Sequence, residues 1–250
     1  MKEVFDIEII DLHKSFKTQK VLRGLNLKIK KGELFVLLGS SGAGKSVLLK
    51  HISGLLKPDK GKIVVLGKEI SSMTEKELLK FRTKIGIVFQ GGGLFNSLTV
   101  YDNVAFPLRE LGLISEDEIR KIVMNNLKKL KVDEFIDKMP SELSGGMIKR
   151  VALARCLCLN SEIILYDEPT AGLDPILSND VDNIIKYFNR EFKKTSLVVT
   201  HDLESAFFLA DRIGVLYEGE LIFVGTKEEF KKNSHPFIKD FLARYKRDFK

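Results

Sequence analysis

The chain has 250 residues, of which 44% are hydrophobic and 30% charged, a balance that is typical of a globular protein and excludes a largely disordered chain. The formal charge of +7 fits either acidic partners, such as nucleotides, nucleic acids or an anionic membrane face, or a surface of scattered, solvated lysines. No apolar run approaches the roughly 20 residues that span a bilayer, and the charged start MKEVFDIEII is unlike a signal peptide. We therefore expect a cytoplasmic chain in which Cys156 and Cys158 are buried thiols, not a disulfide or a metal site.

The first part of the chain predicts strands. Short runs of strand-forming residues at 4–10, 21–29 and 62–66 are separated by turns and predict an antiparallel β layer. Phe16 follows the first run, where the chain should leave the sheet. Its ring could belong to the core or be presented at a binding site, and the pattern leaves both interpretations open. A continuous apolar run at 34–38 predicts a buried strand.

A phosphate-binding loop is predicted directly after this strand. The stretch GSSGAGKS has the P-loop form GxxxxGK(S/T), whose main-chain N–H groups face a phosphate chain. Lys45 would reach the β- and γ-phosphates, and Ser46 would offer its hydroxyl to Mg²⁺. A helix expected over 45–53 would direct the positive end of its dipole at the phosphates. The predicted binding residues are Gly39, Ser40, Ser41, Gly42, Ala43, Gly44, Lys45 and Ser46.

A second predicted strand also ends in a polar residue. The apolar run 85–89 follows a short helix that a capping box should open at Thr74, and it ends at Gln90. The loop from Gly91 to Phe95 comes next, with three glycines before two apolar residues. This loop is either a contact surface or a strained turn.

The pattern from 99 to 159 is helical. Thr99 and Ser115 are predicted to cap two of its helices, and almost no strand signal occurs in this stretch. We therefore expect a helical insertion, broken by Pro107 and Pro140, in an otherwise α/β chain.

The last part of the chain returns to alternating strands and helices. Strands are predicted at 162–166, 196–200, 212–217 and 220–224, with helices over 176–194 and within 226–250.

Polar residues follow several of the predicted strands: the P-loop, Gln90, Asp167 with Glu168, and Thr200 with His201. Because ligands of open α/β sheets bind at the carboxyl ends of strands, we expect these residues to converge on one phosphate-bearing site. Asp167 would hold Mg²⁺, directly or through water, and Glu168 would act as the general base that orients and polarises the attacking water. His201 would donate a hydrogen bond to the γ-phosphate.

A second anion site is predicted at Leu143-Ser144-Gly145-Gly146, which opens the helix running to Leu159. A serine N-cap and two glycines leave N–H groups and a positive dipole exposed there. The residues assign no ligand to this site, and the ligand need not belong to the same chain.

Six motifs occur in the order typical of ATP-binding cassette (ABC) ATPases, and the chain resembles this family over nearly its whole length. They are the P-loop Gly39 to Ser46, Gln90, the signature Leu143-Ser144-Gly145-Gly146-Met147, Asp167 with Glu168, the D-loop Gly172-Leu173-Asp174, and His201. One departure is Met147, where many members have glutamine, and we expect the phosphate contacts through Ser144 and Gly146 to stay intact.

The resemblance implies an α/β fold with a P-loop NTPase core, an N-terminal antiparallel β layer and an inserted α-helical subdomain. The single domain would divide into a RecA-like core with its β layer, 1–91 and 160–225, and a helical insertion with the signature, 92–159. A C-terminal helical segment, 226–250, would complete it.

The resemblance also implies ATP and Mg²⁺ as cofactors and assigns residue roles. The catalytic residues would be Lys45, Gln90, Glu168 and His201. The Mg²⁺ ligands would be Ser46, Gln90 and Asp167. Phe16 would stack on adenine, and ATP held by the P-loop of one copy would contact Ser144, Gly145 and Gly146 of the other copy. The dimer interface would include Ser144, Gly146 and Asp174.

The implied assembly is a head-to-tail homodimer that drives a separate membrane permease through Gly91 to Phe95 and the helical insertion, with accessory regulatory and substrate-binding proteins. It would lie at the inner face of the cell membrane. Segments such as GKSVLLKHI are similar to the Mla/Mkl-type ATPases, which energise the traffic of phospholipid or other hydrophobic substrates across the bacterial envelope. Importer ATPases for polar solutes such as amino acids share much of the pattern.

Two other classes of function fit less well. A nucleic-acid-linked cassette protein is compatible with the charge of +7, but such relatives carry tandem cassettes or long coiled-coil or zinc insertions, and this chain has neither. A non-catalytic nucleotide sensor would not need Glu168 and His201 together.

Overall fold

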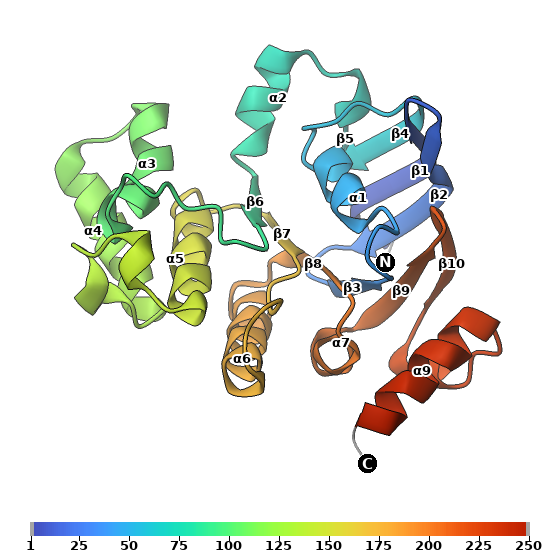
Figure 1. Cartoon of the computed structure of the whole chain (residues 1–250). Coiled ribbons are helices and arrows are strands. Elements are labelled where there is room, and N and C mark those ends of the chain that lie inside the picture. The colour runs from blue at the N-terminus through green and yellow to red at the C-terminus, as the bar shows by residue number, and fades with distance from the viewer. Residues whose placement is uncertain (1–2, 249–250) are drawn as a thin grey trace. The chain divides into compact units, whose positions relative to one another are not determined.

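The computed structural model describes residues 3–248, which form two compact units (Figure 1). One unit contains the chain up to Ser71 and again from Val198, and the other is Ser72–Leu197. Residues 1, 2, 249 and 250, at the outer ends of the predicted core and of the predicted C-terminal segment, lie outside the described residues. Within the described range no helix is both long and apolar enough to cross a membrane.

The first unit contains the predicted antiparallel β layer. Its strands are β1 (Phe5–Phe16), β2 (Gln19–Lys30), β4 (Lys60–Val65) and β5 (Lys68–Glu69), in the order β2-β1-β4-β5. The strand β1 extends six residues beyond its predicted end at residue 10. Irregular pairing around Asp11, whose φ is 48°, bends the strand and lets pairing with β2 continue to Phe16.

A second group of strands in this unit surrounds β3 (Leu34–Leu38), all of whose residues are buried. Strand β3 pairs in parallel with β9 (Arg212–Tyr217), which pairs antiparallel with β10 (Glu220–Gly225). The helices of this unit are α1 (Lys45–Ile52), α7 (Leu203–Leu209), α8 (Lys227–Lys231) and α9 (Pro236–Asp248). The predicted C-terminal helical segment is therefore two helices, because α8 ends at Lys231 and α9 starts only at Pro236.

The second unit combines a parallel strand pair with most of the helices (Figure 1). Its strands are β6 (Ile85–Val88) and β7 (Ile163–Asp167), and β8 (Thr195–Thr200) runs from this unit into the first. Its helices are α2 (Glu75–Arg82), α3 (Val100–Leu111), α4 (Glu116–Lys129), α5 (Gly145–Cys158) and α6 (Pro175–Phe192). The capping boxes predicted at Thr74 and Ser115 are confirmed.

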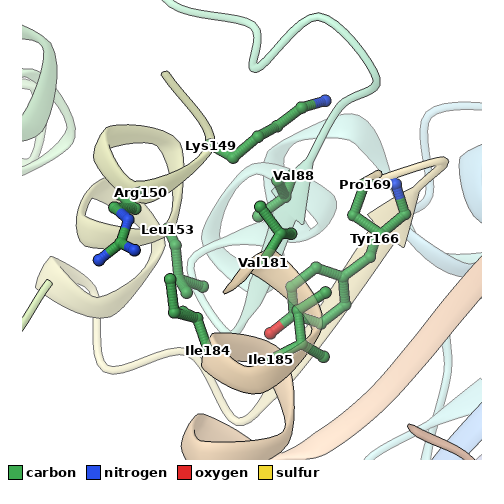
Figure 2. Close-up of a pocket in the computed structure, with 9 residues that line it drawn as sticks. All are labelled: Val88, Lys149, Arg150, Leu153, Tyr166, Pro169, Val181, Ile184 and Ile185. Atoms are coloured by element: carbon green, nitrogen blue, oxygen red, sulfur yellow. The ribbon is translucent and has the colours of Figure 1, made fainter. Parts of the chain in front are cut away.

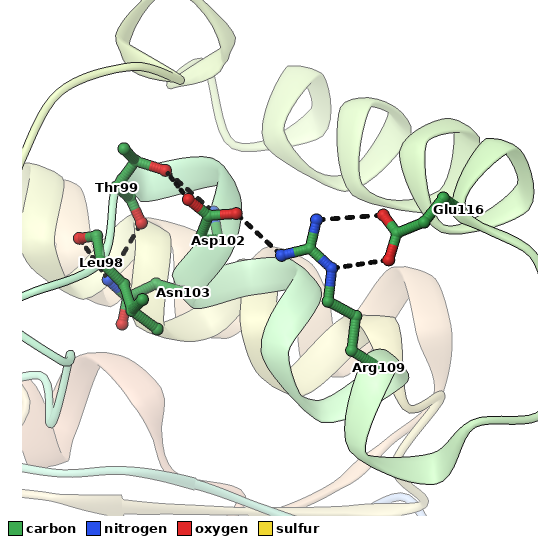
Figure 3. Close-up of polar contacts among 6 residues, drawn as sticks. All are labelled: Leu98, Thr99, Asp102, Asn103, Arg109 and Glu116. Atoms are coloured by element: carbon green, nitrogen blue, oxygen red, sulfur yellow. Dashed lines mark hydrogen bonds and ion pairs between the residues drawn. The ribbon is translucent and has the colours of Figure 1, made fainter.

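The prediction that Pro107 breaks the helical segment is wrong, because α3 continues through it to Leu111. Proline removes one main-chain hydrogen-bond donor from the helix. Side-chain contacts link the C-terminal part of α3 to its first turn and to the next helix. Arg109 donates to both carboxylate oxygens of Glu116, at 2.7 and 3.0 Å, and to Asp102 in the first turn of α3, at 2.8 Å (Figure 3). Pro140, by contrast, starts a 3₁₀ turn between α4 and α5.

Asn103 on α3 organises the chain that enters this helix. Its fully buried amide accepts a hydrogen bond from the main-chain N–H of Phe95 at 2.7 Å. Its nitrogen also lies 3.0 Å from the carbonyl oxygen of Phe95. The same nitrogen lies 3.0 Å from each of the carbonyl oxygens of Leu98 and Thr99 (Figure 3). Residues 95–99 are therefore anchored to α3 by a single side chain.

We expect Asn103→Ala to lower the free energy of unfolding by about 2–3 kcal/mol, because it leaves several buried main-chain groups without their partner. Urea denaturation followed by circular dichroism measures this change. The matched control is Asn183→Ala on the exposed face of α6, which should change the free energy by less than about 0.5 kcal/mol. Equal effects of the two substitutions would contradict the anchoring role of Asn103.

Candidate active site

The P-loop connects β3 to α1 in the first unit, as predicted. Lys45 is 6% exposed, and its ammonium donates hydrogen bonds to the carbonyl oxygens of Gly39 at 2.7 Å and Ser40 at 3.1 Å. The loop is closed further by a hydrogen bond from the N–H of Ala43 to the same Ser40 carbonyl, at 3.2 Å. The positive charge of Lys45 is thus held against the loop that is predicted to bind phosphate.

Two positions of the loop require glycine, one because of close packing and the other because of its backbone conformation. A Cβ atom on Gly39 would lie 2.6 Å from the carbonyl oxygen of Leu216, and Gly44 has a φ of 103°, which L side chains rarely adopt. Gly44 is also the N-cap of α1 and supplies no side-chain oxygen, and no acidic residue lies in the first turn. The N–H groups and positive dipole of this helix end are therefore suited to an anion.

Phe16 lies at the end of β1 with 44% of its surface exposed, so it is not a core side chain. The ammonium of Lys14 is 5.5 Å from the centre of its ring. The hairpin formed by β1 and β2 also adjoins the P-loop, because Val21 and Leu22 of β2 pack against Gly44. Phe16 is therefore available for stacking on a planar group, and its contact with adenine stays a prediction.

His201 is exposed and directly follows β8 in the first unit. The next residue, Asp202, caps α7 through hydrogen bonds from the N–H groups of Glu204 at 2.8 Å and Ser205 at 3.4 Å. Helix α7 packs against β3, the strand that precedes the P-loop. The turn that carries His201 is thus fixed on the same group of strands as the P-loop.

The second unit brings three predicted residues to one edge of its sheet. Strands β6 and β7 run parallel with Val88 opposite Tyr166, so Gln90 and Asp167 follow at the same strand ends. Glu168 comes next with a φ of 47°, a left-handed conformation that costs of order 1 kcal/mol for a non-glycine residue. The tight turn that this conformation creates directs the chain away from β7 immediately after Asp167.

Two basic residues on α5 hold the loop that follows β6, and the sequence analysis missed both. Lys149 donates to the carbonyl oxygens of Phe89, at 3.2 Å, and of Gln90. Arg155 donates to the carbonyl oxygens of Gly93, at 2.7 Å, and Gly92, at 3.4 Å. A basic residue on a helix normally predicts a side chain with a solvated charge, so the sequence carries no signal for these contacts.

Ser144 is the N-cap of α5, as predicted. The hydroxyl of Ser144 accepts a hydrogen bond from the N–H of Met147 at 3.3 Å. A Cβ atom on Gly145 would lie 2.7 Å from the Leu173 side chain, so the signature and the D-loop pack against each other. Beside them lies an open cavity of about 270 Å³, lined by Lys131, Ser144, Gly146, Met147, Arg150, Leu177, Asp180 and Val181.

Asp174, predicted at the dimer interface, caps the next helix. One of its carboxylate oxygens accepts hydrogen bonds from the N–H groups of Ile176 and Leu177, each at 2.9 Å. Asp174 is exposed, and Ile176 beside it has 78% of its surface exposed. The capping role fixes the position of Asp174, whereas a contact across a dimer stays a prediction.

The predicted site residues therefore lie in two groups. The first unit holds Phe16, the P-loop and His201, and the second holds Gln90, the signature, Asp167, Glu168 and Asp174. The donor set predicted for Mg²⁺ consists of the Ser46 hydroxyl, which is exposed at the start of α1, and the oxygens of Gln90 and Asp167. Hydroxyl, amide and carboxylate oxygens are the ligands that Mg²⁺ takes, so the chemistry of these residues fits the ion.

The two cysteines are buried free thiols, as predicted. Burial raises the pKa of Cys156 and of Cys158 to about 11, from a reference value of 9.0. Because the unfolded chain loses these protons first, the two thiols should contribute to a decrease in the free energy of unfolding as the pH rises from about 9 to about 11.

We also expect both thiols to resist iodoacetamide at pH 8, measured by mass spectrometry, and to react fully in urea. Complete labelling of the native protein within minutes would contradict their burial.

Comparison with known proteins identifies the family. A family model described as ABC transporter matches residues 22–171. The chain belongs to the ABC transporter family. It is an ABC ATPase, and its predicted mixed α/β fold is confirmed by a solved ABC cassette. That structure, described as a dimeric post-hydrolysis state of the cassette MJ0796 bound to ADP and Pi, has a TM-score of 0.81 and 36% identity. The match covers 88% of this chain and 98% of the cassette.

Three relatives of this ABC ATPase are named for different functions. The probable ribonucleotide transport ATP-binding protein mkl of Mycobacterium tuberculosis is 42% identical over 94% of this chain, which spans only 66% of the length of that protein. The intermembrane phospholipid transport system ATP-binding protein MlaF of Haemophilus influenzae is 38% identical over 94% of this chain and 89% of its own length. The methionine import ATP-binding protein MetN 1 of Bacillus cereus is 40% identical over 94% of this chain and 69% of its own length.

Proposed function

We propose that this ABC ATPase is the energy-supplying subunit of a membrane transporter, that it hydrolyses ATP as a head-to-tail homodimer, and that it moves phospholipid or another hydrophobic substrate. Two observations carry the proposal: Lys45 is held within the P-loop of the first unit, and Gln90, Asp167 and Glu168 lie at one strand edge of the second unit. A phosphate-binding loop and a hydrolytic group of this kind are what ATP turnover requires.

The residue roles that we propose are those expected from the sequence, and the local geometry supports them. The P-loop N–H groups and Lys45 bind the phosphates, and Phe16 stacks on the base. Ser46, Gln90 and Asp167 hold Mg²⁺, which neutralises charge on the phosphate oxygens when bound. Glu168 orients and deprotonates the attacking water, Gln90 helps to position that water, and His201 donates to the γ-phosphate.

The second copy of the chain supplies the signature. The exposed Ser144 and the uncharged, glycine-rich first turn of α5 suit the γ-phosphate of ATP held by the P-loop of the other copy. The exposed Asp174 and Ile176 lie beside this turn and form part of the interface. The dimeric description of the similar cassette MJ0796 supports this arrangement.

A permease binds the loop Gly91 to Phe95 and the neighbouring helices. Phe95 and Phe106 are 44% and 36% exposed, and their ring centres lie 4.8 Å apart, so they form an apolar contact surface. This contact holds the chain at the membrane as a peripheral subunit.

The substrate class rests on the relatives. The name of MlaF specifies phospholipid, which favours a lipid substrate, whereas MetN 1 is named for methionine import and supports the second candidate, an amino-acid importer. A role with nucleic acid is the least favoured, and a steep salt dependence of affinity for duplex DNA or RNA would revive it.

Reconstitution distinguishes these candidates. The ATPase is co-purified with its permease and reconstituted in vesicles. In one assay a fluorescent phospholipid is placed in the outer leaflet, and in the other radiolabelled methionine is placed either inside or outside the vesicles. ATP-dependent movement of the lipid, absent with the Glu168→Gln variant, is the expected result. Movement of methionine alone would replace the lipid proposal, and the absence of any associated membrane protein would contradict the transporter proposal.

A further inference from the structure

The loop between β6 and α3 is attached to the signature helix by its main chain. Lys149 and Arg155, both on α5, donate to carbonyl oxygens at Phe89, Gln90, Gly92 and Gly93. Gly92 itself packs so closely on α5 that a Cβ atom there would lie 2.3 Å from the Ile148 side chain. The loop is therefore bound along its length to the helix that starts at Ser144.

Of the two basic residues, Lys149 binds the part of the loop that includes Gln90, a predicted catalytic residue. Lys149 is only 6% exposed. Its side chain extends from α5 past Val88 to the end of β6, whereas the side chain of Arg150 points in a different direction (Figure 2). Burying a charged ammonium is unfavourable unless it is hydrogen-bonded, and here carbonyl oxygens of Phe89 and Gln90 supply the bonds. Asp167, at the same strand edge, adds a favourable electrostatic interaction.

The surface beneath Lys149 is apolar and closely packed. Val88, Leu153, Tyr166, Val181 and Ile185 pack from β6, α5, β7 and α6 around a narrow apolar pocket (Figure 2). A lysine stem that lies on such a surface has few alternative conformations, so the position of its ammonium follows the position of α5.

We propose that Lys149 is a positioning residue for ATP hydrolysis, which holds Gln90 through its main-chain carbonyl and so ties the glutamine to the signature helix. The inference rests on the proposed function of Gln90 and extends it. A shift of α5, which begins at the residue that meets the ATP of the partner subunit, is transmitted to Gln90 through this hydrogen bond. The hydrolytic site is then complete only when the signature is in place.

The test replaces Lys149 by methionine, which keeps the apolar stem and removes the donor. We expect kcat for ATP to fall by about 10- to 100-fold, the loss that a small misplacement of a catalytic group causes, while KM for ATP changes by less than about twofold. Lys149→Arg retains a donor and should recover kcat to within about fivefold of the native protein. The matched control is Lys128→Met on the exposed face of α4, which should leave kcat unchanged.

A double-mutant cycle separates positioning from a general structural effect. In a Gln90→Ala background the Lys149→Met substitution should lower kcat by less than about twofold further, because the glutamine side chain that Lys149 positions is already absent. A full second loss in that background, or a native kcat for Lys149→Met alone, would overturn the inference. A native kcat for Gln90→Ala would instead overturn the role proposed for Gln90, so the two failures are distinguishable.

A second measurement does not depend on turnover. Hydrogen exchange of the amides at Gly91 to Gly93 should accelerate in Lys149→Met and not in Lys128→Met, because one anchor of the loop is lost. If Lys149→Met does not fold, Lys149→Leu, whose shorter apolar side chain also lacks a donor, takes its place in both measurements. Unchanged exchange and unchanged kcat in that variant would overturn the proposal.

Discussion

Replacing Glu168 by glutamine is expected to abolish ATP turnover and to preserve ATP binding. The substitution keeps the size of the side chain and its hydrogen-bonding capacity but removes the base that accepts a proton from the attacking water. Loss of a general base lowers kcat by about 10²- to 10⁴-fold. Because hydrolysis would no longer separate the two copies, the variant should accumulate as an ATP-bound dimer. Phosphate release and size-exclusion chromatography with ATP measure the two effects.

The control for this experiment is Glu162→Gln. Glu162 lies just before β7, at the opposite end of the strand from Glu168, where it is exposed and pairs with Lys84 at 2.8 Å. An exposed pair of this kind contributes little, so we expect native turnover and a change in stability below about 1 kcal/mol. Sustained hydrolysis by Glu168→Gln would exclude Glu168 as the base and would return that role to another group.

Replacing Lys45 by alanine is expected to remove ATP binding, or to reduce hydrolysis by at least about 10²-fold. The substitution deletes the charge that lies within hydrogen-bond distance of two P-loop carbonyls and that is predicted to reach the phosphates. Fluorescent-nucleotide titration measures binding, and thermal unfolding shows whether the loop has lost stability as well. Lys50→Ala, at an exposed position on the same helix, is the matched control and should bind ATP as the native protein does. Native binding and turnover in Lys45→Ala would contradict the assignment of Lys45 and the P-loop as the phosphate-binding site.

Local chemistry explains why several predictions from the sequence were correct. The capping residues at Thr74, Ser115 and Ser144 act within one turn of the chain, so their hydrogen bonds depend on spacing alone. The P-loop depends in the same way on glycines at fixed offsets between a buried strand and a helix. The antiparallel pairing of the first strands follows from runs of strand-forming residues and the turns that separate them.

Other features depend on contacts between residues that are distant in the chain. Pro107 suggested a helix break, and only the structure shows that α3 continues through it, with Arg109 bonded to Asp102 and Glu116. Phe16 could not be assigned to core or surface until its exposure was known, because an aromatic residue at the end of a strand is compatible with both. The strained φ of Glu168 is invisible to a pattern of residue types.

The sequence by itself determined the class of the protein and the positions at which its chemistry is predicted, because the P-loop, the signature and the Asp167–Glu168 pair are short motifs whose backbone geometry is local. Only the tertiary structure decided how these motifs are held. Gln90 is fixed by a buried lysine 59 positions away, and Gly145 by the packing of Leu173. Such contacts depend on which helix face meets which loop, and this is settled by the burial of apolar surface across the whole unit.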